Sequence, residues 1–153
     1  MSIAFAEQVT ATLFKDHYDL NVDTIRELNQ ALHNPDLTSS IEHWTVSHPA
    51  GQHNIAVGIN APVQVTIDGH AGYYCAGMNQ QAHVVVNGNV GVGVAENMMS
   101  GSVYVKGNAS QAAGATAHGG LLVIEGDAGA RCGISMKGVD IVVGGNIGHM
   151  SCF

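Results

Sequence analysis

The chain has 153 residues, enough for one domain with a hydrophobic core, and 20 glycines accompany 46% apolar residues while aromatic residues make up only 5% and charged residues 11%. A formal net charge of −7 with only five Lys and Arg residues provides no basic surface that could neutralise a run of phosphates, so we expect no nucleic-acid partner. Residues 1–14 have no cationic stretch ahead of an apolar run, and no segment is apolar over the length that a bilayer requires, so we expect a cytoplasmic protein without membrane contact.

The first element expected is a single helix over residues 24–33. Thr24 and Glu27 have the spacing of a capping box, in which the two side chains satisfy backbone N–H groups of the first helical turn. Apolar residues follow at helical spacing. Pro35 ends the helix, because the residue before a proline is pushed out of the helical conformation.

From about residue 62 the sequence repeats every 19 residues. A glycine column marks the repeat and consists of Gly69, Gly88, Gly107, Gly126 and Gly145. The position after each glycine holds, in successive copies, His70, Asn89, Asn108, Asp127 and Asn146. We expect each pair to form a corner in which the glycine supplies a positive φ and the Asn or Asp suits the same left-handed conformation.

Two apolar columns, two positions apart, precede each corner. The first column consists of Val65, Val84, Val103, Leu122 and Ile141, and the second of Ile67, Val86, Val105, Ile124 and Val143. Alternation with period two predicts a strand with one face against a core. One strand and one corner per copy predict an all-β fold, a right-handed parallel β-helix whose copies stack as rungs. A leucine-rich repeat is the competing solenoid, but its L-x-x-L-x-L pattern is absent.

These patterns divide the chain into three parts. Residues 1–40 form an N-terminal extension with one helix, residues 41–61 a connecting segment, and residues 62–153 a β-helix of five rungs, the last incomplete. Because the ends of a solenoid expose strand edges, we expect the extension and the connecting segment to cover one end. At the other end, either a partner covers the edge or the chain is a fragment.

Residues that depart from their column are candidates for contact with other molecules. Glu96 and Arg131 replace uncharged residues of two columns, and His118 and Lys137 interrupt a third. They are either solvated corner residues or residues that contact a partner subunit or line a polar channel.

The outward positions of the strands form a second candidate surface. These positions hold Thr66, Val85, Tyr104, Val123 and Val142. Since they recur one rung apart, they form a continuous apolar strip that a monomer should not expose to water. The strip therefore predicts a protein partner.

No group of residues indicates catalysis, a cofactor or a metal on this chain. The three cysteines are an odd number without C-x-x-C spacing, which argues against a disulfide framework, a zinc site and an iron–sulfur cluster. His43, His48 and His53 are five positions apart, a spacing that suits neither a helix face nor a strand face.

Several sequence runs resemble a known family. The corner G-x-x-G-x-x-x-G, best seen at Gly126, Gly129 and Gly133, resembles the GXGXG β-helix domain of the glutamate synthase large subunit family. The chain also contains the runs GQHNIAVG, DGHAGYYCAGMNQ, GVAENMMSG, GATAHGG and CGISMKGVDIVVGG. These runs resemble the stand-alone form of the domain, which is the GlxC-like middle subunit of N-methylglutamate synthase complexes. The resemblance covers residues 20–153.

The resemblance implies a non-catalytic scaffold subunit of a flavin-dependent complex that makes N-methylglutamate and ammonia from methylamine and glutamate. Its implied partners are a class II amidotransferase-like subunit and a subunit that holds FMN and an iron–sulfur cluster, with a channel for ammonia or methylamine nearby. Ser2 stands where an amidotransferase of this class has its nucleophilic cysteine, in keeping with a chain that lacks that activity. A subunit of another glutamate synthase-like oxidoreductase and a free-standing ligand-binding solenoid remain the alternatives.

Overall fold

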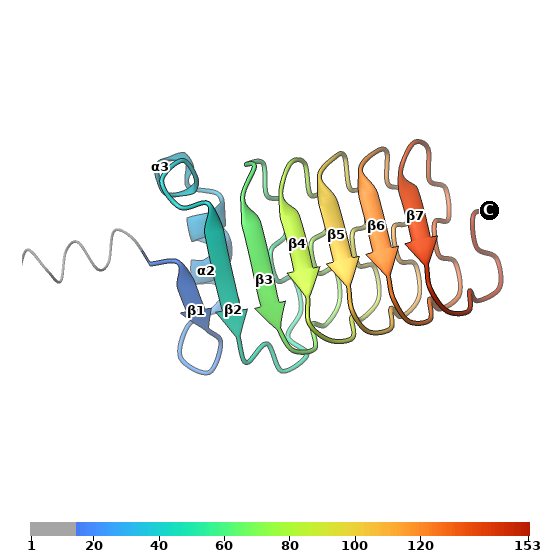
Figure 1. Ribbon diagram of the computed structural model, residues 1–153, viewed down its shortest axis with the longest axis horizontal. Helices are drawn as coiled ribbons and strands as arrows, with labels where there is room; N and C mark the ends of the chain where they lie inside the picture. Colours follow the sequence, from blue (N-terminus) through green and yellow to red (C-terminus); the bar gives the residue numbers. More distant parts are fainter. Residues whose placement is uncertain (1–14) are drawn as a thin grey trace, which may run out of the picture.

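The computed structural model describes residues 15–153, so the expectations about a signal sequence and about Ser2 lie outside the described residues. Seven parallel strands pair in chain order to form one sheet. The elements are β1 (His17–Asp19), α2 (Ile25–Leu32), α3 (Pro35–Thr38), β2 (His43–Ser47), β3 (Gln64–Asp68), β4 (His83–Val86), β5 (Ser102–Val105), β6 (Leu121–Ile124) and β7 (Asp140–Val143). The strands lie side by side along the long axis, and the segments that connect them return behind the sheet (Figure 1). This arrangement confirms the predicted parallel β-helix.

The register of the sheet follows the predicted columns. Val84 pairs with Val65 on one side and with Val103 on the other, so equivalent residues of successive copies are direct neighbours. From β3 to β6, both inward positions of each strand are fully or almost fully buried. Each such Val, Ile or Leu contributes about 1.5–3 kcal/mol when it is removed from water. A single rung has too few of them to offset the entropy of ordering its backbone, so the rungs are stable only as a stack.

The glycine column has a different origin from the one expected. Only Gly69 has a positive φ, at 139°, and the four later glycines of the column do not. A Cβ atom at Gly107 would lie 2.3 Å from Oδ1 of Asn89 and 2.7 Å from the carbonyl oxygen of Gly88. The expectation of a left-handed corner is therefore wrong for these glycines. They are required because the preceding rung lies too close to admit a side chain.

The column after the glycines forms a ladder of side chains along the solenoid. Oδ1 of Asn108 accepts a hydrogen bond from the backbone N–H of Asp127 at 2.8 Å, and Asp127 accepts one from Asn146 at 2.7 Å. His70 and Asn89 accept equivalent bonds from the rung that follows each of them. None of these five residues has a positive φ, so the predicted left-handed role is wrong and the column instead satisfies backbone donors of the next rung.

Left-handed conformations occur in the return segments, which comprise residues 73–78, 92–97, 111–116 and 130–135. Every second residue there has a positive φ, as at Tyr74 (58°), Ala76 (53°) and Met78 (54°). The N–H of Tyr74 bonds to Val92 of the next rung at 2.8 Å. The N–H of Ala76 bonds to Ile55 of the preceding rung at 3.0 Å. The return segments are thus a second hydrogen-bonded face across the core from the sheet, which the sequence did not predict.

At the N-terminal end, the stack continues beyond the part predicted to be repetitive. β2 pairs with β3 along its whole length, and β1 pairs with β2, so segments expected only to cover the end contribute strands of their own. Helix α2 covers the equivalent segment of the preceding rung, residues 54–58, where Asn29 donates to the carbonyl of Asn54 at 2.8 Å and His33 Nε2 lies 2.7 Å from the carbonyl of Val57. The division at residues 40 and 61 stays a prediction, because the sheet runs through both points.

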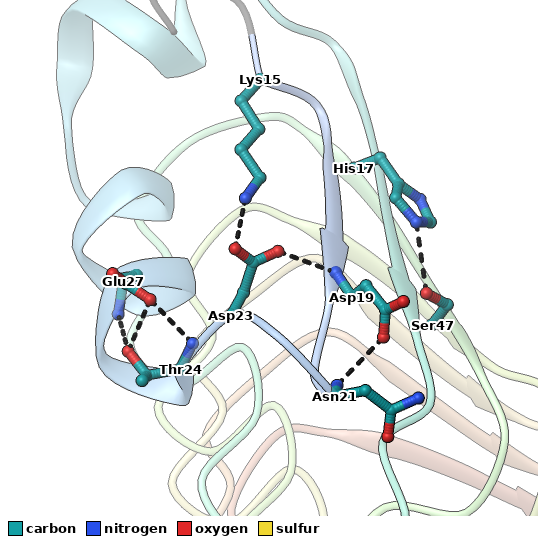
Figure 2. A network of polar contacts seen from close by, with 8 residues as sticks. All are labelled: Lys15, His17, Asp19, Asn21, Asp23, Thr24, Glu27 and Ser47. Carbon is teal, nitrogen blue, oxygen red and sulfur yellow. Dashed lines mark hydrogen bonds and ion pairs between the residues drawn. The ribbon is translucent and has the colours of Figure 1, made fainter.

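A polar network joins β1 to α2 (Figure 2). Lys15 forms an ion pair with Asp23, whose second carboxylate oxygen accepts the backbone N–H of Asp19 at 2.9 Å. Thr24 and Glu27 form the predicted capping box, which begins α2. A second short helix, α3, begins where the first was expected to stop, because a proline is favourable at the first position of a helix. Neither helix within residues 15–153 combines the length and apolar character needed to cross a membrane.

Candidate functional site

The outward face of the sheet carries the apolar strip, defined as Thr66, Val85, Tyr104, Val123 and Val142. Tyr104 pairs with Val85 on one side and with Val123 on the other, so the strip is continuous across the rungs. Its members are partly exposed from Thr66 to Val123, and Val142 is 53% exposed. The predicted orientation is confirmed, while the role of the strip as an interface stays a prediction.

Polar side chains border the apolar strip on the same face. The hydroxyl of Tyr104 donates to Oε1 of Glu125 at 2.5 Å, and this bond does most to raise the pKa of Tyr104. On the other side, Nδ1 of His83 lies 2.8 Å from the hydroxyl of Ser102. An apolar centre with a polar border is the composition of many protein–protein interfaces.

A second candidate surface lies on the return segments. It is a small hollow of about 190 Å³, which we call the Tyr74–Glu96 hollow, lined by Asn54, Val57, Tyr74, Gly77, Met78, Glu96 and Asn97. Tyr74 and Met78 are 45% and 52% exposed, whereas Glu96 is half-buried. The hollow thus places one carboxylate among exposed aromatic and thioether side chains.

Gly93 determines how the two principal residues of the hollow meet. A Cβ atom on this glycine would lie 2.7 Å from Cδ1 of Tyr74 and 2.8 Å from Oε2 of Glu96. The absence of a side chain therefore lets the ring and the carboxylate approach the same point of the backbone. The equivalent positions of the next two rungs hold Ala112 and Arg131. Their side chains would leave less room for an aromatic ring in the rung that precedes each of them.

The structure does not gather the four predicted departures into one site. Arg131 is exposed and lies two rungs beyond Gly93 in the same column. His118 and Lys137 are exposed in a third column, one rung apart. Neither ion pair formed by residues 15–153 includes any of the four residues. Glu96 lines the Tyr74–Glu96 hollow. The contact and channel roles of all four residues stay predictions.

The cysteines differ in their environments. Burial raises the pKa of the Cys75 thiol to about 12. Burial also raises the pKa of Cys132, with a smaller contribution from the nearby Cys152, which is exposed. A thiol must ionise to act as a nucleophile, so the two buried cysteines are unreactive near neutral pH. Among residues 15–153, no three His, Cys, Asp or Glu side chains lie close enough together to hold a metal ion.

The sequence reasoning missed the aromatic and methionine residues around the hollow. Tyr73, which is 48% exposed and lies beside Tyr74, extends the apolar surface beyond the hollow itself. Tyr73 stacks on His53 with ring centres 4.3 Å apart and contacts Tyr74 edge-on. The signal was present in the repeat, since the pair of tyrosines stands where the next copy has a valine and a glycine.

Comparison with known proteins finds a partial relative. No protein-family model and no solved structure matches the chain. Protein GlxC of Rhizobium meliloti (strain 1021) is 58% identical over 58 residues, which make up 38% of this chain. The matched part corresponds to 25% of the length of that relative, so the chain spans about a quarter of it. The chain is therefore related to GlxC over this stretch.

Proposed function

We propose that this chain is a non-catalytic scaffold subunit of a flavin-dependent glutamate synthase-like complex, specifically N-methylglutamate synthase. That complex converts methylamine and glutamate to N-methylglutamate and ammonia. The amidotransferase-like subunit and the subunit with FMN and the iron–sulfur cluster carry out the chemistry, and the solenoid holds them in place and frames a channel for ammonia or methylamine.

The observation that carries the proposal is the identity of 58% with GlxC over 58 residues. The sequence runs that resemble the stand-alone GXGXG subunit point to the same complex. The chemistry of the chain is compatible with this division of work, because its two buried thiols have raised pKa values.

The geometry supports a scaffold in a further way. The apolar strip is continuous over several rungs of a rigid sheet, and its flanking residues are polar. Such a surface fits a protein partner better than a small ligand, which needs a concave site that buries most of its surface.

The test is purification of the tagged chain from its own host, followed by sizing and identification of the co-eluting chains. We expect two larger subunits in a fixed ratio, a flavin absorbance in the complex, and formation of N-methylglutamate from methylamine and glutamate. A complex that uses a different amine would favour another glutamate synthase-like oxidoreductase. Elution of the chain by itself, with no larger subunit, would contradict the proposal.

The apolar strip supplies a second test of the scaffold role. Tyr104→Asp combined with Val123→Asp places two carboxylates in the proposed interface, where unpaired charge is costly, and leaves the inward columns unchanged. We expect the partners to be lost while the β-rich circular dichroism of the chain is kept. Gln64→Asp, on the same face but outside the strip, is the control and should retain them. Recovery of the flavin subunit at the wild-type ratio with the double variant would exclude the strip as the interface.

A further inference from the structure

The Tyr74–Glu96 hollow lies on a different face of the solenoid from the apolar strip. The strip is on the outward side of the sheet, whereas most residues of the hollow belong to the return segments. These segments run behind the sheet (Figure 1). The side chains of the sheet and of the return segments meet in one core between the two faces. A partner bound through the strip therefore leaves the hollow to be explained separately.

The apolar surface around the hollow has the composition of an interaction site. Tyr73, Tyr74 and Met78 are each between 45% and 52% exposed, and Tyr73 contacts Tyr74 edge-on. Tyrosine and methionine are enriched at the centres of protein interfaces, and isolated monomers rarely expose such clusters. Over residues 92–97, 111–116 and 130–135, the columns of Tyr74 and Met78 hold smaller or polar residues, and the Tyr74 column has a large apolar residue again at Met150, which is 47% exposed.

The charge of the hollow is uncompensated. Glu96 takes part in neither of the two ion pairs within residues 15–153, which join Lys15 to Asp23 and His48 to Asp19. A half-buried carboxylate beside apolar groups attracts a cation more strongly than a fully solvated one, because the local dielectric constant is lower. The Tyr74 ring lies beside the same glycine as this carboxylate, and an aromatic ring there can add a cation–π contact with the same cation.

An arginine side chain combines the properties that this pair of groups can bind. Its guanidinium forms two parallel hydrogen bonds with a carboxylate and stacks on an aromatic ring. A hollow of about 190 Å³ is smaller than the sites of about 300–1,000 Å³ that enclose a free ligand. An arginine within a protein segment is accompanied by apolar residues of that segment, which can cover the exposed tyrosine and methionine side chains.

We propose that the Tyr74–Glu96 hollow is a docking site for an arginine presented by a partner protein, with the guanidinium between the Glu96 carboxylate and the Tyr74 ring. The net charge of −7 favours a basic partner surface at this point. The inference rests on the proposed role of the chain as a subunit of a complex, and it adds a second contact surface to that role.

The experiment uses the tagged chain in its own host, with a photoreactive benzoylphenylalanine at Met78. Val22, which is 83% exposed in the loop before α2, is the control position for the same probe. After irradiation, mass spectrometry of the cross-linked peptides identifies what covers the hollow. We expect Met78 to cross-link to an arginine-containing peptide of a co-purifying larger subunit, and Val22 not to do so.

Charge reversal then tests the contact itself. Glu96→Arg should lower the recovery of that subunit about tenfold or more, because like charges in an interface cost several kcal/mol. Reversing the cross-linked arginine to glutamate should restore it, and Tyr74→Ala should weaken recovery without a charge change. Asp36→Arg, the same charge reversal on α3, is the matched control for Glu96→Arg and should keep the wild-type recovery. Circular dichroism checks that each variant is folded.

The possible failures are distinguishable. If no larger subunit co-purifies with the wild-type chain, both the proposed function and this inference are wrong. If the subunits co-purify and their ratio is unchanged in Glu96→Arg and in Tyr74→Ala, only the docking site is wrong. A cross-link from Met78 to a second copy of this chain would also overturn it.

Discussion

Each rung of this solenoid has two hydrogen-bonded faces built on opposite principles. In the sheet, extended residues alternate between core and solvent, and β-branched side chains suit that conformation. In the return segments, every second residue is left-handed, although many of them are not glycine, as at Ala95 and Thr116. An L-residue pays about 1–2 kcal/mol for this conformation, and the bonds to both neighbouring rungs offset it.

The two faces differ in what determines their conformation. The sheet is specified by side chains, because its columns must be apolar on one side. The return segments are specified by the stack, because their strained conformation is satisfied only when adjacent rungs supply hydrogen-bond partners. Substitutions in the two faces should therefore change the free energy of unfolding by different amounts and, in some cases, in opposite directions.

The largest expected effect is on the sheet face. Leu122 is fully buried and the adjacent Leu121 is 39% exposed, which makes them a matched pair. Leu122→Ala should lower the free energy of unfolding by about 2–5 kcal/mol through lost burial and a cavity. Leu121→Ala should change it by about 0.5 kcal/mol or less. Urea unfolding followed by circular dichroism measures both, and similar losses would contradict the assigned register.

The next effect tests the close contact between rungs. A side chain at Gly107 meets a backbone carbonyl of the preceding rung, so Gly107→Val should cost about 1–3 kcal/mol or more through overpacking. Gly77→Val is the control, since Gly77 has no positive φ, a Cβ there would lie 3.2 Å from its nearest neighbour, and later copies have Glu96, Ala115 and Ile134 at that position. If the two variants lose the same melting temperature, the column is not set by close approach.

The side-chain ladder should contribute less. Asn108→Ala removes the acceptor for the N–H of Asp127, which should cost about 0.5–1.5 kcal/mol. Asn108→Asp keeps an acceptor oxygen at the same place and should lose little of that stability. Chemical denaturation of the two variants gives the difference. Equal losses would mean that the ladder bond does not stabilise the stack.

The return face should respond with the opposite sign. Ala112 has a φ of 58°, so Ala112→Gly relieves strain and should raise the free energy of unfolding by up to about 1 kcal/mol after the added chain entropy is subtracted. Its neighbour Ala113 is fully buried and has no positive φ, and Ala113→Gly should lower stability. Two losses of similar size would show that left-handed strain is not significant there.

The smallest effect concerns the N-terminal end and depends on pH. Hydrogen bonds lower the pKa of Asp23, chiefly from Lys15, and of Glu27, chiefly from the backbone of Thr24. Groups with a lowered pKa stabilise the fold above their ordinary values near about 4, and the stability is lost as the pH falls through the lowered values. The melting temperature should therefore fall on acidification, and Asp23→Asn should flatten this dependence. An unchanged slope would exclude a contribution from Asp23.

The regular part of the fold was predictable because its signal repeats. Val84 and Val86 mark an inward face in one copy, and four further copies carry an apolar pair at the same two positions. The strands at the N-terminal end were not predictable in this way, since β2 is offset from β3 by 21 residues and β1 from β2 by 28. These spacings fall outside the period of 19 on which the prediction depended.

The candidate surfaces were predictable to different degrees. The orientation of the apolar strip followed from strand alternation alone, because side chains in a strand point to opposite faces in turn. The hollow depends on the left-handed return segments. They bring the ring of Tyr74, from one rung, and the carboxylate of Glu96, from the next, to Gly93. No alternation in the sequence encodes that conformation, so Glu96 was identified as a departure from its column while Tyr74 was not.

The bonds between rungs join like to like, and this makes the length of the solenoid adjustable in discrete steps. Loss of residues 88–106 would connect Asn87 directly to Gly107 and leave every column in phase. Each such event would shorten the stack by one strand spacing, about 4.8 Å, without altering the rungs that remain. Duplication or deletion of one copy in the gene would therefore change, by one strand spacing, the distance between two proteins bound at different rungs of the solenoid.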